Sequence, residues 1–218
     1  MKSAVCMILM GVCAFAQAPP PAAPPKEAPA AETTKGMPPR ANPVEYQAQA
    51  VLGPVTLAAE FSGHGINTEQ KALTTEEYVV VEVGVFGAPG TRVRLSAEDF
   101  SLRINGKKNA ESTQPFLTIR PTLKDPEWEP PINTKKSQTS VGDEGGGKGE
   151  PPPEPPKMPF AERRAMEQRV LKMTLPEGDR ATPVAGLIFF SYRGKITSLK
   201  SLELVYNGPA GKASLNLH

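Results

Sequence analysis

One valine-rich stretch constrains the fold of this chain more than any other. Residues 77–86 read Glu-Tyr-Val-Val-Val-Glu-Val-Gly-Val-Phe, and β-branched residues favour strands. Side chains alternate along a strand, so the two faces carry Val79, Val81, Val83 and Val85 on one side and Tyr78, Val80, Glu82 and Phe86 on the other. A face made wholly of valine must be covered by other segments. We therefore expect residues 77–86 to form a central strand in the core.

Short runs with strand patterns recur along the chain, separated by turn residues. We expect strands at residues 47–52, 55–61, 92–95, 100–104, 116–119, 171–175, 184–190, 202–206 and 213–217. The segment 116–119 is expected to return antiparallel to 100–104 after the hairpin signal Asn105-Gly106, and Asn207-Gly208 predicts a second hairpin. Residues 62–67 are expected to form a loop. Short strands at regular spacing predict an all-β antiparallel sandwich rather than βαβ units.

Composition divides the chain into a leader, a linker and one domain. Residues 1–16 have the pattern of a signal peptide, with Lys2 ahead of a short apolar run and Ala14 and Ala16 before the cleavage point. That run is shorter than the ~20 residues needed to span a membrane. Residues 17–44 form a Pro/Ala-rich linker, expected to be extended or disordered. The domain covers residues 45–218, interrupted by a low-complexity Pro/Gly-rich loop at about 121–159.

Cysteine usage and charge exclude several classes of protein. Cys6 and Cys13 are the only cysteines, so cleavage after Ala16 leaves no disulfide and no thiolate metal site. Lipid anchoring is not favoured, because Val12 stands where a small residue should precede the acylated cysteine. The formal net charge of +2 gives no strong attraction to nucleic acid or membranes. We expect an exported, periplasmic or extracellular protein with no transmembrane segment after leader cleavage.

Neither a nucleotide-binding site nor a catalytic site is supported by the sequence motifs. Residues 142–148 match the first seven positions of a P-loop, but Gly149 stands where Ser or Thr should hold Mg²⁺. The chain has two histidines, His64 and His218, and no Gly-x-Ser-x-Gly nucleophile elbow. His64 is expected to be a loop residue. We expect no catalytic residue, no cofactor and no enzymatic activity.

Three acidic residues surround the only tryptophan. Asp125, Glu127 and Glu129 could offer oxygen ligands to Ca²⁺, but their spacing is not that of an EF-hand, and a solvated acidic loop is favoured over a metal site. Trp128 either packs on the sandwich or presents an aromatic anchor to a partner. Packing is the favoured alternative.

Residues 160–168 predict a short amphipathic helix, opened by Pro159 at its first position. Phe160, Met166 and Val170 lie on its apolar face, opposite a mixed charge face. We expect the helix to cover one end of the sandwich. If the domain has a partner-binding surface, we expect Trp128 with Arg163 and Arg164 to form it.

An ordered series of core and turn motifs identifies a family. It comprises Tyr78-Val79-Val80-Val81-Glu82-Val83, Phe100-Ser101-Leu102, Leu175-Pro176-Glu177-Gly178, Gly186-Leu187-Ile188-Phe189 and Leu202-Glu203-Leu204-Val205-Tyr206. The series resembles a bacterial exported immunoglobulin-like domain of unknown function, often found on lipoproteins and related to a secreted mycobacterial immunogenic protein. The resemblance covers roughly residues 48–217 and carries no catalytic residues. It implies an immunoglobulin-like sandwich that acts as a non-enzymatic binding or accessory module for another envelope or extracellular protein. A structural spacer, and an enzyme inhibitor or unrecognised enzyme, remain as alternatives.

Overall fold

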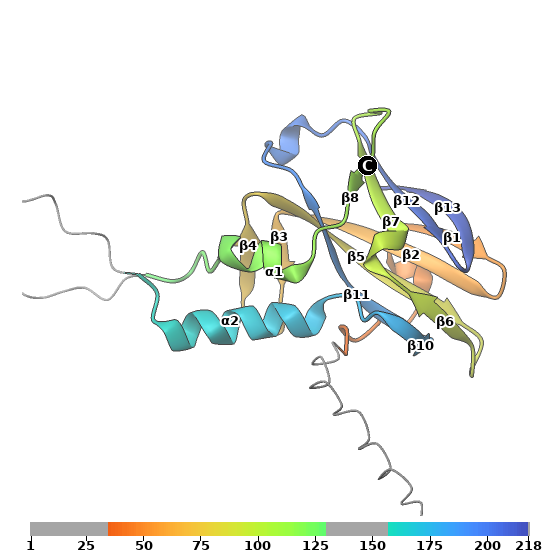
Figure 1. Cartoon of the computed structure of the whole chain (residues 1–218), viewed down its shortest axis with the longest axis horizontal. Helices are drawn as coiled ribbons and strands as arrows, with labels where there is room; N and C mark the ends of the chain where they lie inside the picture. Colours follow the sequence, from red (N-terminus) through yellow and green to blue (C-terminus); the bar gives the residue numbers. More distant parts are fainter. Residues whose placement is uncertain (1–34, 130–156, 218) are drawn as a thin grey trace, which may run out of the picture. The chain divides into compact units, whose positions relative to one another are not determined.

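The computed structural model describes residues 35–129 and 157–217, which form mostly antiparallel β-sheets (Figure 1). The predicted signal peptide, most of the predicted linker, and residues 130–156 of the predicted low-complexity loop lie outside these residues. Residues 121–129 of that predicted loop are described, and they include the end of a 3-10 turn (Arg120–Thr122) and a short strand, Leu123–Lys124.

The first sheet is built around the valine-rich stretch. Its four antiparallel strands lie in the order β1 (Ala48–Leu52), β2 (Val55–Gly63), β5 (Tyr78–Gly87) and β11 (Val184–Ser191). Residues Tyr78 to Val85 of β5 are all buried, as are Val184 to Phe190 of β11. The predictions of a central strand at 77–86 and of a strand at 184–190 are confirmed, and burial of successive residues shows that both faces of each strand are covered.

The second four-stranded sheet lies in the order β13 (Gly211–Asn216), β12 (Leu202–Gly208), β7 (Phe100–Ile104) and β8 (Glu111–Ser112). Asn105 and Gly106 both have positive φ, 53° and 65°, as the predicted hairpin turn requires. The second predicted hairpin also forms. Its turn lies two residues later than predicted, because Asn207 and Gly208 are still paired with β13.

The two sheets contribute to one hydrophobic core, which we call the first core. All four valines of the predicted apolar face of β5 lie in it. The facing sheet contributes large side chains that are almost fully buried, among them Phe100, Leu102, Leu204 and Tyr206. A two-stranded ribbon of β6 (Arg92–Leu95) and β10 (Gly178–Ala181) adds Val93 and Leu95 to the same core.

The opposite face of the first sheet is covered too, by a second core. Elements on that face are the three-stranded sheet β3 (Gly65–Asn67), β4 (Ala72–Thr75) and β9 (Leu123–Lys124), and the helices α1 (Phe116–Ile119) and α2 (Phe160–Met173). Tyr78 and Val80 from β5 pack there with Met166 and Val170 from α2. Figure 1 shows α2, α1 and β3–β4 gathered beside β5 and β11. Of this extra layer, only helix α2 was predicted from the sequence; α1 and the three-stranded sheet were not.

Three local predictions are wrong. Residues 116–119 form helix α1, because Phe116 and Ile119 both pack on the second core at helical spacing while Leu117 is 73% exposed. The strand that returns beside β7 is β8 instead. Residues 62–67 are not a loop, since they contain the end of β2 and the whole of β3. Helix α2 continues to Met173, so residues 171–173 are helical rather than extended.

The free edge of β11 is protected by three separate segments. The carbonyl oxygens of Ala185, Leu187 and Phe189 accept hydrogen bonds from the backbone N–H groups of Met37, Leu175 and Gln114, at 3.0, 3.0 and 2.8 Å. An uncovered edge strand is a template for aggregation. These three contacts therefore satisfy the edge and fix the positions of the segments that cross it.

Candidate functional site

The structure does not join the three residues predicted to form a partner-binding surface. Trp128 is half-buried and belongs to neither core; its backbone N–H donates to the backbone carbonyl of Asp125 at 3.2 Å. Arg163 is exposed and lies 5.8 Å above the ring of Phe160. Arg164 is also exposed. Within residues 35–129 and 157–217, no hydrogen bond, ion pair or ring contact links Trp128 to either arginine.

Helix α2 is anchored by fewer apolar residues than predicted. Met166 and Val170 are 3% and 0% exposed and pack into the second core, as their spacing predicts. Phe160 is 67% exposed, because the helix begins there and its first turn projects beyond the sheet. Its partner is the Arg163 guanidinium on the same helix.

The acidic loop forms a turn rather than a cluster of free carboxylates. The Asp125 carboxylate pairs with the Lys71 ammonium at 3.0 Å and accepts the N–H of Glu127 at 3.0 Å. Burial acts to raise the pKa of Asp125, but the Lys71 and Glu127 hydrogen bonds, with the charges of Lys71 and Arg169, hold it below its usual range. In the part of the chain that the structure describes, no group of three or more His, Cys, Asp or Glu side chains could hold a metal ion.

His64 is the turn residue between β2 and β3, outside both strands as predicted, and its side chain links three segments. Its Nδ1 lies 2.7 Å from the carbonyl oxygen of Tyr78, and its Nε2 lies 3.1 Å from that of Gly194. The ring stacks on Tyr192 with centroids 6.2 Å apart. These contacts assign His64 a structural role at the corner between β2 and β3.

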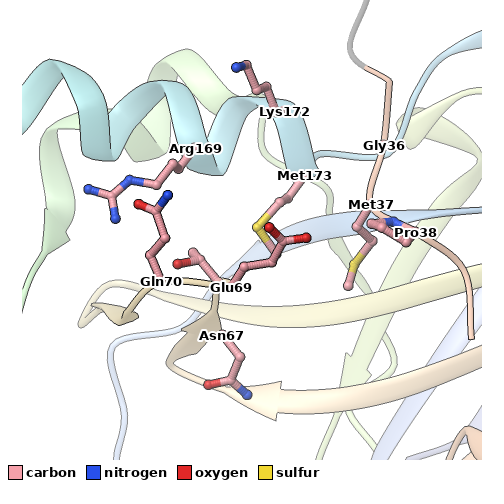
Figure 2. Close-up of a pocket in the computed structure, with 10 residues that line it drawn as sticks. Gly36, Met37, Pro38, Asn67, Glu69, Gln70, Arg169, Lys172 and Met173 are labelled. Carbon is pink, nitrogen blue, oxygen red and sulfur yellow. The ribbon is translucent and has the colours of Figure 1, made fainter.

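A pocket opens at one end of α2, where three segments distant in sequence meet (Figure 2). It has a volume of about 420 Å³, within the ~300–1,000 Å³ range of pockets that hold small ligands. Its three walls are residues 36–38, the turn between β3 and β4, and the C-terminal end of α2. The lining residues are Gly36, Met37, Pro38, Asn67, Thr68, Glu69, Gln70, Arg169, Lys172 and Met173.

The first wall belongs to residues 35–46, which we call the strap. Met37 pairs with Ala185 at the edge of β11, and Gly36 allows this close approach. Gly36 has φ +76°, and a Cβ added there would lie 2.3 Å from the Ala185 oxygen. Only glycine adopts such a conformation at little cost.

Arg40 latches the strap onto the first sheet. Glu60 and Glu82 lie directly opposite each other on β2 and β5, a like-charge arrangement that is unfavourable without a cation. The Arg40 guanidinium contacts both carboxylates, meeting Glu82 through two nitrogens at 3.0 and 3.3 Å. It also lies 4.5 Å above the ring of Tyr46. Glu82 is only 7% exposed, so Arg40 is the cation that compensates the burial of its carboxylate.

Tyr46 closes the strap over β5. Its hydroxyl is buried without a hydrogen-bond partner among the described residues. Burial, followed by the nearby Glu82 charge, raises the pKa of Tyr46 to about 12. The ring can lie this close to the sheet because Gly84 has no side chain; a Cβ there would meet the Tyr46 hydroxyl at 2.7 Å.

The other two walls are fixed by backbone hydrogen bonds. In the β3–β4 turn, the N–H and hydroxyl of Thr68 both donate to the Lys71 carbonyl, at 3.1 and 2.6 Å. At the end of α2, the N–H and hydroxyl of Thr174 both donate to the Leu171 carbonyl, at 3.2 and 2.8 Å. Each wall therefore presents its side chains from a defined backbone.

The pocket combines opposite charges with an apolar floor. The Arg169 Nε–H donates a hydrogen bond to the Ala165 carbonyl at 3.3 Å. The two terminal nitrogens of the guanidinium can therefore donate to a ligand. In the described ranges, Glu69, Arg169 and Lys172 form no ion pair with one another or with other residues. Met37 and Met173 are partly buried and pack against the second core. The arrangement can bind a ligand but contains no nucleophile paired with a base.

The pocket could not be predicted from the sequence. The alternation at 171–175 predicts a strand that includes Met173, and the turn residues Glu69 and Gln70 belong to no recognised motif. The one local signal was Gly36-Met37-Pro38, where the proline-rich composition gives way to the domain. No protein family, curated protein or solved structure matches this chain.

Proposed function

We propose that this chain is an exported, non-enzymatic binding or accessory module of the cell envelope, and that it binds another envelope or extracellular protein. Its scaffold is an immunoglobulin-like sandwich to which a third layer has been added. The observation that carries this proposal is the pocket at the end of α2, with a built frame and unpaired charged side chains at its rim. Such a frame supports recognition, because its walls are positioned before a ligand arrives.

Export is supported by the sequence of residues 1–16, which has the pattern of a signal peptide. The resemblance to exported immunoglobulin-like domains agrees with export. In residues 35–129 and 157–217, no helix has the length and apolar character needed to cross a membrane.

A cross-linked pull-down from the native cell envelope tests the proposal. The bait is the chain beginning at Gln17, compared with a variant carrying Glu69→Gln and Arg169→Gln. The matched control carries Glu111→Gln and Lys212→Gln, which remove the same charges from exposed positions on β8 and β13. We expect both the unchanged chain and the control to capture a partner that the pocket variant loses.

Equal capture by all three baits would move the binding surface away from the pocket, toward Trp128, Arg163 and Arg164 or the sheet faces. No capture by any bait would favour the structural spacer. Substitution is preferable to deleting the predicted loop, because residues 123–125 pair with β4 and Lys71 and belong to the folded domain.

A further inference from the structure

We propose that the pocket binds a short peptide in which one apolar side chain lies between an amino group and a carboxylate group. This inference rests on the proposed binding function and names the ligand of the same site. Glu69 receives the amino group, Arg169 receives the carboxylate, and Met37 with Met173 receives the apolar side chain.

The floor of the pocket fits an apolar side chain of variable shape. Met37 and Met173 come from the strap and from α2, and both are half-buried against the second core. Figure 2 shows their side chains reaching into the space between the helix and the strap. Methionine is unbranched and polarizable, so it adapts to different apolar groups.

The charges of the pocket are divided between two walls. Arg169 lies on α2, and Figure 2 shows its guanidinium on the side facing Gln70 of the β3–β4 turn. Glu69 extends from that turn toward Met173, whereas the Lys172 side chain points away from both. The cations also lie in the last turns of α2, where the helix dipole favours positive charge. A ligand must therefore satisfy an acid and a base at separate points.

This division argues against ligands of one charge. A phosphate or another small anion would bind Arg169 but would be repelled by Glu69. A metal cation would meet Glu69 and two thioethers but would be repelled by Arg169. A ligand carrying both charges avoids both conflicts, because each of its charges then faces a side chain of opposite charge.

Amide groups at the rim match a peptide backbone. Asn67 and Gln70 are exposed, and their side-chain amides form no hydrogen bond within the part of the chain described. Each amide can donate and accept a hydrogen bond, as a peptide group requires. Together with the volume of about 420 Å³, they favour a ligand of a few residues over a single ion.

Isothermal titration calorimetry of the chain from Gln17 tests the proposal. The probes are the tripeptide Ala-Leu-Ala with free termini, its N-acetyl form, its C-terminal amide and the analogue Ala-Ser-Ala. We expect the free tripeptide to bind, and each of the three changes to weaken binding about tenfold, the cost of one charge-assisted hydrogen bond or one buried apolar side chain.

Paired variants identify the groups involved. With Glu69→Gln, the free and N-acetyl tripeptides should bind equally, whereas the amide should still be weaker. With Arg169→Gln, the reverse pattern is expected. The control variants Glu111→Gln and Lys212→Gln should behave like the unchanged chain, and thermal unfolding verifies that all variants are folded.

A second probe distinguishes peptide termini from an internal segment of a protein. Acetyl-Lys-Ala-Leu-Ala-Asp-amide carries both charges on side chains, so its binding with the same variant pattern would assign the site to an internal segment. Binding of the free tripeptide alone would assign it to free peptides. Either result supports the proposal. Affinities that do not respond to Glu69→Gln and Arg169→Gln, or no binding of any probe, would overturn it.

If the envelope partner is nevertheless lost by the pocket variant in the pull-down, the proposed function stands and only the ligand chemistry fails.

Discussion

Arg40 shows how much of the strap depends on a single side chain. Two glutamates face each other across β2 and β5, and Arg40 is the cation that makes their proximity tolerable. One of them, Glu82, has a side chain that is only 9% exposed. Removing the cation therefore leaves a buried charge without a partner, which costs more than losing a surface ion pair.

We predict that Arg40→Gln lowers the free energy of unfolding by about 2 kcal/mol. Arg40→Lys should recover only part of this loss, because an ammonium cannot form the two-nitrogen contact with Glu82. Urea unfolding of the variants measures both effects. In the double variant Arg40→Gln with Glu82→Gln, much of the stability should return; a double variant as unstable as the sum of the single ones would contradict the latch.

Asp125 provides a prediction about pH. Its pKa is below the usual range in the folded state, so its contribution to stability is fully present above the ordinary aspartate pKa of ~3.9 and is lost as the pH falls through the lower folded value. Because Lys71 is 40% exposed, the pair contributes about 1 kcal/mol at pH 7 after screening by solvent.

The comparison of the unchanged chain with Asp125→Asn by urea unfolding checks this prediction. The difference in unfolding free energy should be greatest near neutral pH and should shrink below about pH 4. A difference that stays constant between pH 7 and pH 3 would show that the charge of Asp125 does not contribute.

At the scale of elements, helix α2 is stabilised mainly by the residues that it buries in the second core. Val170 is 0% exposed in the second core, while Phe160 at the start of the helix is 67% exposed. We predict that Val170→Ala lowers the unfolding free energy by about 2 kcal/mol through lost burial and the cavity left behind. Phe160→Ala should change it by less than ~0.5 kcal/mol. Equal losses in thermal or urea unfolding would contradict the position of α2.

Sequence patterns correctly predicted those elements whose conformation is determined by their own residues. The valine run of β5, the apolar run of β11 and the signal at Asn105-Gly106 specify strands and a turn without help from distant residues. Helix α1 and the β3–β4–β9 sheet escaped prediction, because their short segments take their conformation from packing on the second core. Met173 looked extended by alternation, yet Met166, Val170 and Met173 also fit helical spacing, and burial of that face decided the outcome.

At the scale of the molecule, the candidate site is a product of assembly. Its walls come from residues 36–38, 67–70 and 169–173, and nothing in any one of these segments marks a binding site. The covered edge of β11 brings two of them together, because Met37 and Leu175 pair with Ala185 and Leu187, two residues apart on the same strand. The sequence predicted a binding module and placed its surface at Trp128, Arg163 and Arg164; the pocket became visible only with the tertiary structure.

Hydrogen–deuterium exchange tests the central claim that this pocket is the binding surface. The chain from Gln17 would be measured alone and in complex with the partner captured from the envelope. We predict slower exchange on binding in the peptides that contain residues 36–38, 67–70 and 169–173, with little change in β6 and β10. Protection confined to other segments, with exchange at these three unchanged, would contradict the claim.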